Sequence, residues 1–262
     1  MVMSLTEKRY LQECLISKPP LRPDGRNDDQ FRPIEVFTDF LPTSNGSSKI
    51  VASDGTECVV SVKSKVVDRS LEDDLIVVDV DITGRRDDSP LVQEIASILN
   101  RVLLLQIDQE QLRLTQKYSF KLYIDVLVLS SYSHPLTLIS FAIYSALNST
   151  QLPTLISSED DLDVAELPTF HDYDMSKLNI DIPIMFTLAV CGQNVIVDPA
   201  SSESDVASNG ILVTWCKGKV GAPIRTLSLN EEYTRGIHPD RLAESIRLIE
   251  ILAPKVLQAL DG

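Results

Sequence analysis

The chain has 262 residues, which fits one large domain or two modest ones, and its 44% hydrophobic and 24% charged residues are typical of a globular protein. The 24 Lys and Arg residues stand against 38 Asp and Glu residues, giving a net charge of -14. Nucleic-acid binders usually carry a basic surface that neutralises phosphates, so this charge argues against a chain that binds RNA or DNA by itself.

The negative charge is concentrated in the middle of the chain. Residues 122–216 contain one basic residue, Lys177, against 12 acidic residues, several of them in a dense cluster over residues 159–174. We interpret this cluster as a solvated acidic loop, because runs of like charge repel one another and prefer water. A docking face for a basic partner protein is the functional alternative, whereas the spacing does not match a Ca²⁺-binding loop.

Cysteine and histidine positions give no metal signal. The four cysteines form no C-x-x-C pair, and no histidine lies at ligand spacing from a cysteine or another histidine, so we expect no metal and no other cofactor. Cys58 and Cys191 lie in apolar runs and are predicted to be buried free thiols. The N-terminus does not show a signal-peptide pattern and no apolar run approaches the ~20 residues that cross a bilayer, which predicts a soluble protein of a reducing compartment without a membrane partner.

The first third of the chain predicts one helix followed by strands. Residues 5–16 are expected to be helical, with Thr6 as the N-cap and prolines ending the helix soon afterwards. Strands are expected over residues 34–37, 49–52, 57–67 and 75–82. Asp54-Gly55 is a strong hairpin signal between the second and third of these strands.

Helical and strand periods alternate in the remainder. Apolar residues recur at helical spacing after Pro90, residues 118–129 read as a long buried strand, and residues 136–147 as a helix that is apolar nearly all round. Further strands are expected over residues 183–190, 195–197, 211–216 and 220–229. A last helix from Pro239 is expected to be interrupted by Pro254. This order predicts a mixed α/β (α+β) fold with antiparallel hairpins, not a doubly wound sheet.

Common catalytic motifs are missing from the sequence. It has no P-loop, no dinucleotide-binding glycine pattern, no G-x-S-x-G and no H-E-x-x-H. His134 precedes a proline in a turn and is expected to be exposed. His171 lies in F-H-D-Y-D, where acid–base chemistry is the less favoured of two interpretations.

Four ordered stretches carry a family resemblance over roughly residues 20–230. They are R-P-D-G-R at 22–26 with F-R-P-I at 31–34, N-G-S at 45–47 with D-G-T at 54–56, I-D-V-L-V-L at 124–129, and V-D-P at 197–199 with Glu203. Together they resemble the RNase PH family, and among its members the fungal ring subunits of the exosome. The resemblance implies an antiparallel-rich mixed sheet backed by helices and a second, smaller α/β half. The expected division is an N-terminal helix and arm over residues 1–30, a first half over 31–160 and a second half over 161–262.

The resemblance also implies a function and partners. The chain is expected to be a structural subunit of a six-membered ring that shapes an RNA channel for 3′-to-5′ RNA processing and decay. Expected partners are the other RNase PH-like ring subunits, including a heterodimer partner of the other class, cap subunits, a separate hydrolytic nuclease, and RNA inside the assembled ring. The expected location is the nucleus and nucleolus, and also the cytoplasm.

Two departures from the catalytic members predict an inactive chain. Where they carry a Gly-Thr-Arg turn that holds phosphate at a helix N-terminus, residues 132–135 read Y-S-H-P, which supplies no arginine and removes a backbone donor. Where they carry an aspartate pair that handles metal and proton transfer, the chain has Ser204 and Gly210, with Asp205 one residue away. We therefore expect no catalytic residues and no metal.

RNA contact is a separate expectation. Non-catalytic archaeal relatives carry two arginines one helical turn apart along the RNA path, and the matching positions here are Ser97 and Arg101. Arg101 is thus a candidate RNA-binding residue, with a surface arginine or a structural ion pair as the alternative. Arg85 and Arg86 are weaker candidates, since neighbouring aspartates offset their charge.

Two other functions remain open at this point. One is an active phosphorolytic 3′-to-5′ exoribonuclease. The other is a free-standing adaptor that uses the acidic cluster to recruit basic proteins.

Overall fold

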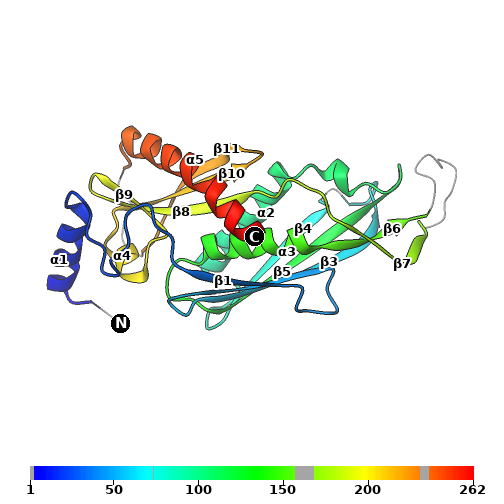
Figure 1. Ribbon diagram of the computed structural model, residues 1–262, viewed down its shortest axis with the longest axis horizontal. Coiled ribbons are helices and arrows are strands. Elements are labelled where there is room, and N and C mark those ends of the chain that lie inside the picture. Colours follow the sequence, from blue (N-terminus) through cyan, green and yellow to red (C-terminus); the bar gives the residue numbers. More distant parts are fainter. Residues whose placement is uncertain (1–2, 73, 157–167, 231–235) are drawn as a thin grey trace.

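The computed structural model describes residues 3–72, 74–156, 168–230 and 236–262, which form two sheets and the helices packed on them (Figure 1). The first sheet has five strands in the order β1-β2-β3-β5-β4, formed by β1 (Ile34–Thr38), β2 (Gly46–Ala52), β3 (Glu57–Asp68), β4 (Ile76–Ile82) and β5 (Tyr118–Ser130). Only the β4–β5 pair is parallel. A parallel pair needs a crossover, and α2 (Pro90–Gln106) with η1 (Gln109–Leu112) lies in that connection.

The second sheet has four strands in the order β11-β10-β8-β9. Its strands are β8 (Ile184–Cys191), β9 (Asn194–Val197), β10 (Asn209–Cys216) and β11 (Lys219–Leu227), with α4 (Ser201–Val206) between β9 and β10 and α5 (Pro239–Asp261) after β11. Every residue of β8 and of β10 is buried, as expected for strands in the middle of a covered sheet. The prediction of a mixed α/β fold with a second, smaller half is confirmed.

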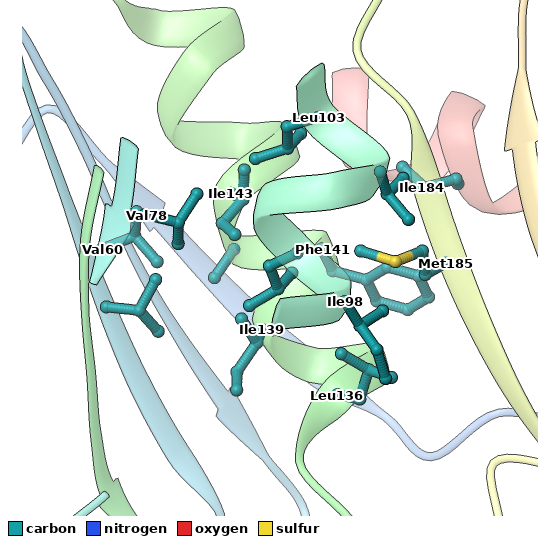
Figure 2. Packing of buried hydrophobic residues seen from close by; sticks show 14 of the residues in the cluster. Val60, Val78, Ile98, Leu103, Leu136, Ile139, Phe141, Ile143, Ile184 and Met185 are labelled. Carbon is teal, nitrogen blue, oxygen red and sulfur yellow. The ribbon is translucent and has the colours of Figure 1, made fainter. Parts of the chain in front are cut away.

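Helix α3 (Leu136–Ser149) joins the two sheets into one core. It contacts β2 and β3 on one side and β8 on the other, so residues all round it are buried. Figure 2 shows Ile139, Phe141 and Ile143 among the buried apolar side chains that fill this space. Phe141 also packs against Phe186 of β8, with ring centroids 5.6 Å apart. The apolar sequence of α3 is therefore explained by burial against two sheets.

Hydroxyl groups of α3 replace a missing strand at one edge of β8. Strand β9 pairs with residues 188–191, and the Asp198 N–H beyond it donates to the Thr187 carbonyl at 3.3 Å, so among the described residues no strand pairs with the first half of that edge. There the Met185 N–H donates to Ser140 Oγ and the Thr187 N–H donates to Thr137 Oγ1, both at 2.8 Å. Buried backbone donors need partners, so these two hydroxyls stabilise the junction of α3 and β8.

Thr137→Val should therefore lower the free energy of unfolding by about 1–3 kcal/mol, because the variant keeps the shape of the side chain but leaves a buried N–H without an acceptor. Urea unfolding of the full chain measures the change. Thr137→Ser is the matched control, since it keeps the acceptor. Equal stability of the Val and Ser variants would contradict this role.

Two details of the helices differ from the predictions. The N-cap of α1 (Leu5–Ile16) is Ser4 and not Thr6: Ser4 Oγ accepts from the Glu7 N–H at 3.3 Å, and Glu7 accepts from the Ser4 N–H at 2.7 Å, a capping box. Helix α5 continues through Pro254, so the predicted interruption is wrong. Pro254 has no N–H to donate to the Glu250 carbonyl, four residues earlier. Both residues are exposed, so water can hydrate that carbonyl.

The acidic cluster lies only partly within the described residues. Residues 157–167 are outside them, whereas Asp172 and Asp174 are exposed on β7 (Phe170–Lys177). Strand β7 pairs with β6 (Gln151–Leu155) in a two-stranded sheet that was not predicted. Cys58 and Cys191 are buried and free as predicted, and burial raises the pKa of each thiol to about 12. Among the described residues, no helix is long and apolar enough to cross a membrane.

Candidate functional site

A fully buried ion pair ties the N-terminal arm to the second half of the chain. The Arg22 guanidinium donates to both carboxylate oxygens of Glu203, from Nε at 2.8 Å and from Nη2 at 2.7 Å. The remaining donors of Arg22 reach backbone carbonyls, among them those of Val197 and Asp198 at 3.2 and 3.1 Å. Glu203 also accepts from the Ala200 N–H at 2.7 Å. Both charges are thus fully paired, as burial requires.

Asp198 forms a second cluster with Arg26 of the arm and with Arg32, which follows the arm. Its carboxylate accepts from Arg26 Nη1 at 3.0 Å, from Arg32 Nη2 at 2.6 Å and from the Arg32 backbone N–H at 2.8 Å. Burial opposes ionisation of Asp198, yet the hydrogen bonds and charge of Arg32, with the charge of Arg26, hold its pKa below the ordinary value. Asp198 also adopts a left-handed backbone, with φ of 47°, directly before Pro199. A strained residue that is so fully bonded has a fixed, structural position.

Arg32 extends this cluster to the first sheet. Its Nη1 forms an ion pair with Asp54 in the β2–β3 turn and donates to Ser133 Oγ at 2.8 Å. Three of the four stretches that carry the family resemblance therefore meet at one network. Arg22, Arg26 and Arg32 are all paired with carboxylates there, Asp24 among them, so none of these three cations is free for an anionic ligand.

The turn at residues 132–135 is closed. The Ser133 hydroxyl already accepts a hydrogen bond from Arg32, and Pro135, the N-cap of α3, provides no side-chain cap. The adjacent cavity of about 20 Å³ has room for roughly one water. The prediction that His134 is exposed is wrong. Both of its ring nitrogens are buried, and neither has a hydrogen-bond partner among the described residues. The apolar start of α3 and the walls of the cavity cover the ring. This helix N-terminus therefore does not present an open phosphate site.

Burial of His134 predicts a pH dependence of stability. Burial lowers the pKa of His134 from 6.5 to about 4, so between these values the unfolded chain binds a proton that the folded chain does not. Stability is then fully present above about pH 6.5 and falls as the pH drops towards 4. From pH 7 to pH 5 the loss from this residue should be about 2 kcal/mol.

Urea unfolding at several pH values checks this expectation, with His134→Leu as the comparison. The variant should lose about 2 kcal/mol less over that interval than the parent chain. Parallel stability curves for the two chains would show that His134 does not titrate as the burial requires.

The two positions of the missing aspartates are also unsuited to metal chemistry. Ser204 is buried on α4, and its hydroxyl has no partner among the described residues. A Cβ atom at Gly210 on β10 would lie 2.7 Å from the Leu227 carbonyl oxygen, so that position admits no side chain without movement of the backbone. Asp205, the residue after Ser204 on α4, is half-buried. Within the described ranges, no group of three or more His, Cys, Asp and Glu residues is arranged to hold a metal ion.

The three candidate RNA-binding arginines take no part in the ion pairs of this network. Arg101 and Ser97 are both exposed on α2, one helical turn apart, and Glu94 on the same face pairs with Arg225 of β11 at 3.1 Å. Arg85 and Arg86 are exposed in the β4–α2 connection, where Arg86 pairs with Asp88 at 2.9 Å. Since Arg101 is about 17 Å along the helix axis from Pro90, the structure does not gather the three arginines at one point. Their contact with RNA stays a prediction.

His171 has an exposed environment. Its Nδ1 lies 3.7 Å from the Asp174 carboxylate on a strand that is exposed along nearly its whole length. Such a pair lacks the water-excluded surroundings in which acid–base catalysis is effective. The structure thus favours the interpretation of this motif as a surface feature.

Comparisons with known proteins agree with this arrangement. A family model described as "3′ exoribonuclease family, domain 1" (RNase_PH) matches residues 30–153. The chain is 56% identical to "Exosome complex component RRP42" of Saccharomyces cerevisiae over 264 residues, covering 100% of both chains, and 30% identical to "Exosome complex component rrp42" of Schizosaccharomyces pombe over 79% of this chain and 76% of that one. It is similar in fold to a chain of the solved "Archaeal exosome core", with a TM-score of 0.76 and 20% identity over 98% of this chain and 97% of the other.

Proposed function

Because the chain belongs to the RNase PH family, we propose that it is a non-catalytic structural subunit of the RNase PH-like ring of an RNA exosome. The observation that carries this proposal is the 56% identity to the yeast exosome component over the full length of both chains. Its role there would be to form part of the wall of the channel through which RNA passes during 3′-to-5′ processing and decay.

The local geometry supports a subunit without phosphorolytic activity. Phosphorolysis needs a bound phosphate to attack the terminal phosphodiester, and groups that stabilise the developing charge. The turn before α3 is closed by His134 and Pro135, and its serine is bonded to Arg32. Ser204 and Gly210 supply no carboxylate for a metal. A rival function, an active 3′ exoribonuclease, is suggested by the description of the family.

A phosphorolysis assay separates the two functions. The full chain is incubated with RNA, inorganic phosphate and Mg²⁺, alone and together with its RNase PH-like partner. We expect no nucleoside diphosphate from the chain alone, and no more from the pair than the partner releases by itself. Phosphate-dependent release by the chain alone would overturn the non-catalytic assignment.

We further propose that Arg101 contacts RNA in the assembled ring, with Arg85 and Arg86 as secondary candidates. Arg101 is exposed on α2 and holds one of the two positions, one helical turn apart, at which arginine is expected along an RNA path, whereas Ser97 holds the other. An exposed guanidinium binds phosphate oxygens through charge-assisted hydrogen bonds.

Arg101→Glu should weaken RNA binding by the assembled particle roughly tenfold, the equivalent of about 1.4 kcal/mol, and leave assembly intact. Crosslinking of RNA to the particle, at low and at moderate salt, measures the loss. Arg247→Glu, at an exposed position on α5, is the matched control and should leave crosslinking unchanged. Equal crosslinking for the parent and the Arg101 variant would rule out the contact.

The proposal extends to the assembly and its location. We propose direct pairing with an RNase PH-like subunit of the other class, contact with cap subunits, delivery of RNA to a separate hydrolytic nuclease, and residence in the nucleus, the nucleolus and the cytoplasm. We also propose a division into an arm over residues 1–30 and halves over residues 31–160 and 161–262. The contacts of α3 with both sheets support halves that fold together.

A further inference from the structure

The hairpin of β6 and β7 lies at one end of the molecule, next to the end of the first sheet (Figure 1). Its base is firmly attached: the Gln151 N–H donates to the Asn45 carbonyl at 2.8 Å and the Leu178 N–H donates to the Thr150 carbonyl at 2.9 Å. Phe170 stacks on Phe120 of β5, with ring centroids 5.7 Å apart. The strand is therefore held in position by the first sheet.

One edge of β7 is open. Among the described residues β7 pairs only with β6, and each of its residues after Phe170 is exposed. Tyr173 is 93% exposed and Met175 is 50% exposed. A bare edge strand that carries exposed apolar side chains tends to pair with another chain, and natural proteins usually cover such an edge.

The charge of β7 selects the kind of partner. Asp172 and Asp174 alternate in sequence with the exposed Tyr173 and Met175, in a stretch where the register with β6 is broken between the Pro153–Met175 and Leu155–Phe170 pairs. Lys177 ends the strand and offsets one of the two aspartates, and it is the only Lys or Arg in the 95 positions from 122 to 216. An acidic strand repels RNA phosphates and attracts lysine and arginine. Strand addition supplies affinity through backbone hydrogen bonds and specificity through alternate side chains.

We propose that the open edge of β7 binds an extended segment of a partner protein that is rich in lysine or arginine and also carries apolar residues. Asp172 and Asp174 bind its cations, and Tyr173 and Met175 pack against its apolar side chains. No residue of β7 belongs to the arginine–carboxylate network or to the candidate RNA-binding arginines.

Peptide binding to the full chain tests the site by fluorescence anisotropy. The probe is a labelled ten-residue peptide of alternating Lys and Val, compared with an alternating Glu-Val peptide and with a Lys-Val peptide interrupted by proline, which cannot complete a strand. We expect the Lys-Val peptide to bind, and both comparison peptides to bind at least tenfold more weakly. Equal binding of the proline-interrupted peptide would overturn strand pairing, and tighter binding of the Glu-Val peptide or of an RNA oligonucleotide would overturn a basic protein partner.

Two double variants locate the binding on β7. Tyr173→Ser/Met175→Ser and Asp172→Lys/Asp174→Lys should each weaken the Lys-Val peptide about tenfold or more. Glu13→Lys/Glu250→Lys, at exposed positions on α1 and α5, makes the same change of net charge as the Asp pair and should cause less than a twofold loss. An equal loss in this control would show attraction by net charge alone and contradict the site.

The native assembly supplies a second readout. A photo-crosslinking residue at position 173 should join to a lysine- or arginine-rich segment of a neighbouring protein. Ring mass is measured in parallel, so a failure of docking with an intact ring is distinguishable from a failure of the proposed ring function. A crosslink to RNA, or to an acidic segment, would contradict the proposal.

Discussion

Glu203→Gln should lower the free energy of unfolding of the full chain by about 3–5 kcal/mol, one of the largest losses expected from any single substitution in this protein. The variant keeps the size of the side chain but removes its charge, so the buried Arg22 guanidinium loses the carboxylate to which it donates at 2.8 and 2.7 Å. An unpaired buried cation is far more costly than an exposed one. Urea unfolding at pH 7, followed by circular dichroism, measures the change.

Glu244→Gln provides the matched control. Glu244 pairs with Arg241 on the surface of α5, where solvent screens the interaction, so its loss should cost less than about 1 kcal/mol. A loss below about 1 kcal/mol for Glu203→Gln would mean that the arm is held by its backbone contacts and not by the buried ion pair.

Gly210→Asp, which restores one carboxylate of the catalytic members, should prevent stable folding. The new Cβ atom would lie 2.7 Å from the Leu227 carbonyl oxygen and from Leu229 Cγ. Overpacking of this kind costs about 1–3 kcal/mol, and a buried carboxylate without a partner adds several more. Since domains are stabilised by only about 5–15 kcal/mol, we expect loss of soluble protein or a large drop in Tm.

Gly236→Asp is the control for this substitution. Its Cβ would have no heavy atom within 4 Å, and the position is exposed, so stability should change by less than about 0.5 kcal/mol. A folded Gly210→Asp chain with near-normal stability would show that the β10–β11 pairing moves to admit the side chain. The structural argument against a second aspartate would then be wrong.

The sequence predicted the elements whose signals are local. Apolar periodicity located α2, a segment that is apolar nearly all round located α3, and Asp54-Gly55 located the β2–β3 turn. The hairpin of β6 and β7 was not predicted, because polar residues dominate β7 and an alternating apolar face is absent. The hydrogen bonds from β8 to the hydroxyls of Thr137 and Ser140 were not predicted either. These hydroxyls lie 50 and 45 residues along the chain from the N–H groups that donate to them.

The sequence indicated which catalytic side chains the candidate site lacks, but not which residues pair with one another there. The missing arginine and aspartates were visible in the sequence, whereas the pairing of Arg22 with Glu203 spans 181 residues and that of Arg32 with Asp198 spans 166. No spacing rule connects such distant residues. A usable signal was present nonetheless: three arginines lie within residues 22–32, and Asp198 and Glu203 follow an apolar run that would bury them without partners.

Net charge and local structure now give a consistent account of this chain. The buried charges are neutralised inside the fold, and the excess acid lies outside the positions where catalytic relatives bind phosphate. A net charge of -14 disfavours RNA binding by the chain alone. It is compatible with a ring subunit whose channel is built jointly with its neighbours.

The mass of the native assembly, with its direct neighbours identified by crosslinking, tests the central claim. We predict that the chain elutes in a particle with five other RNase PH-like subunits of similar size and crosslinks to two of them. A free chain, or a complex without RNase PH-like neighbours, would contradict the proposal of a ring subunit.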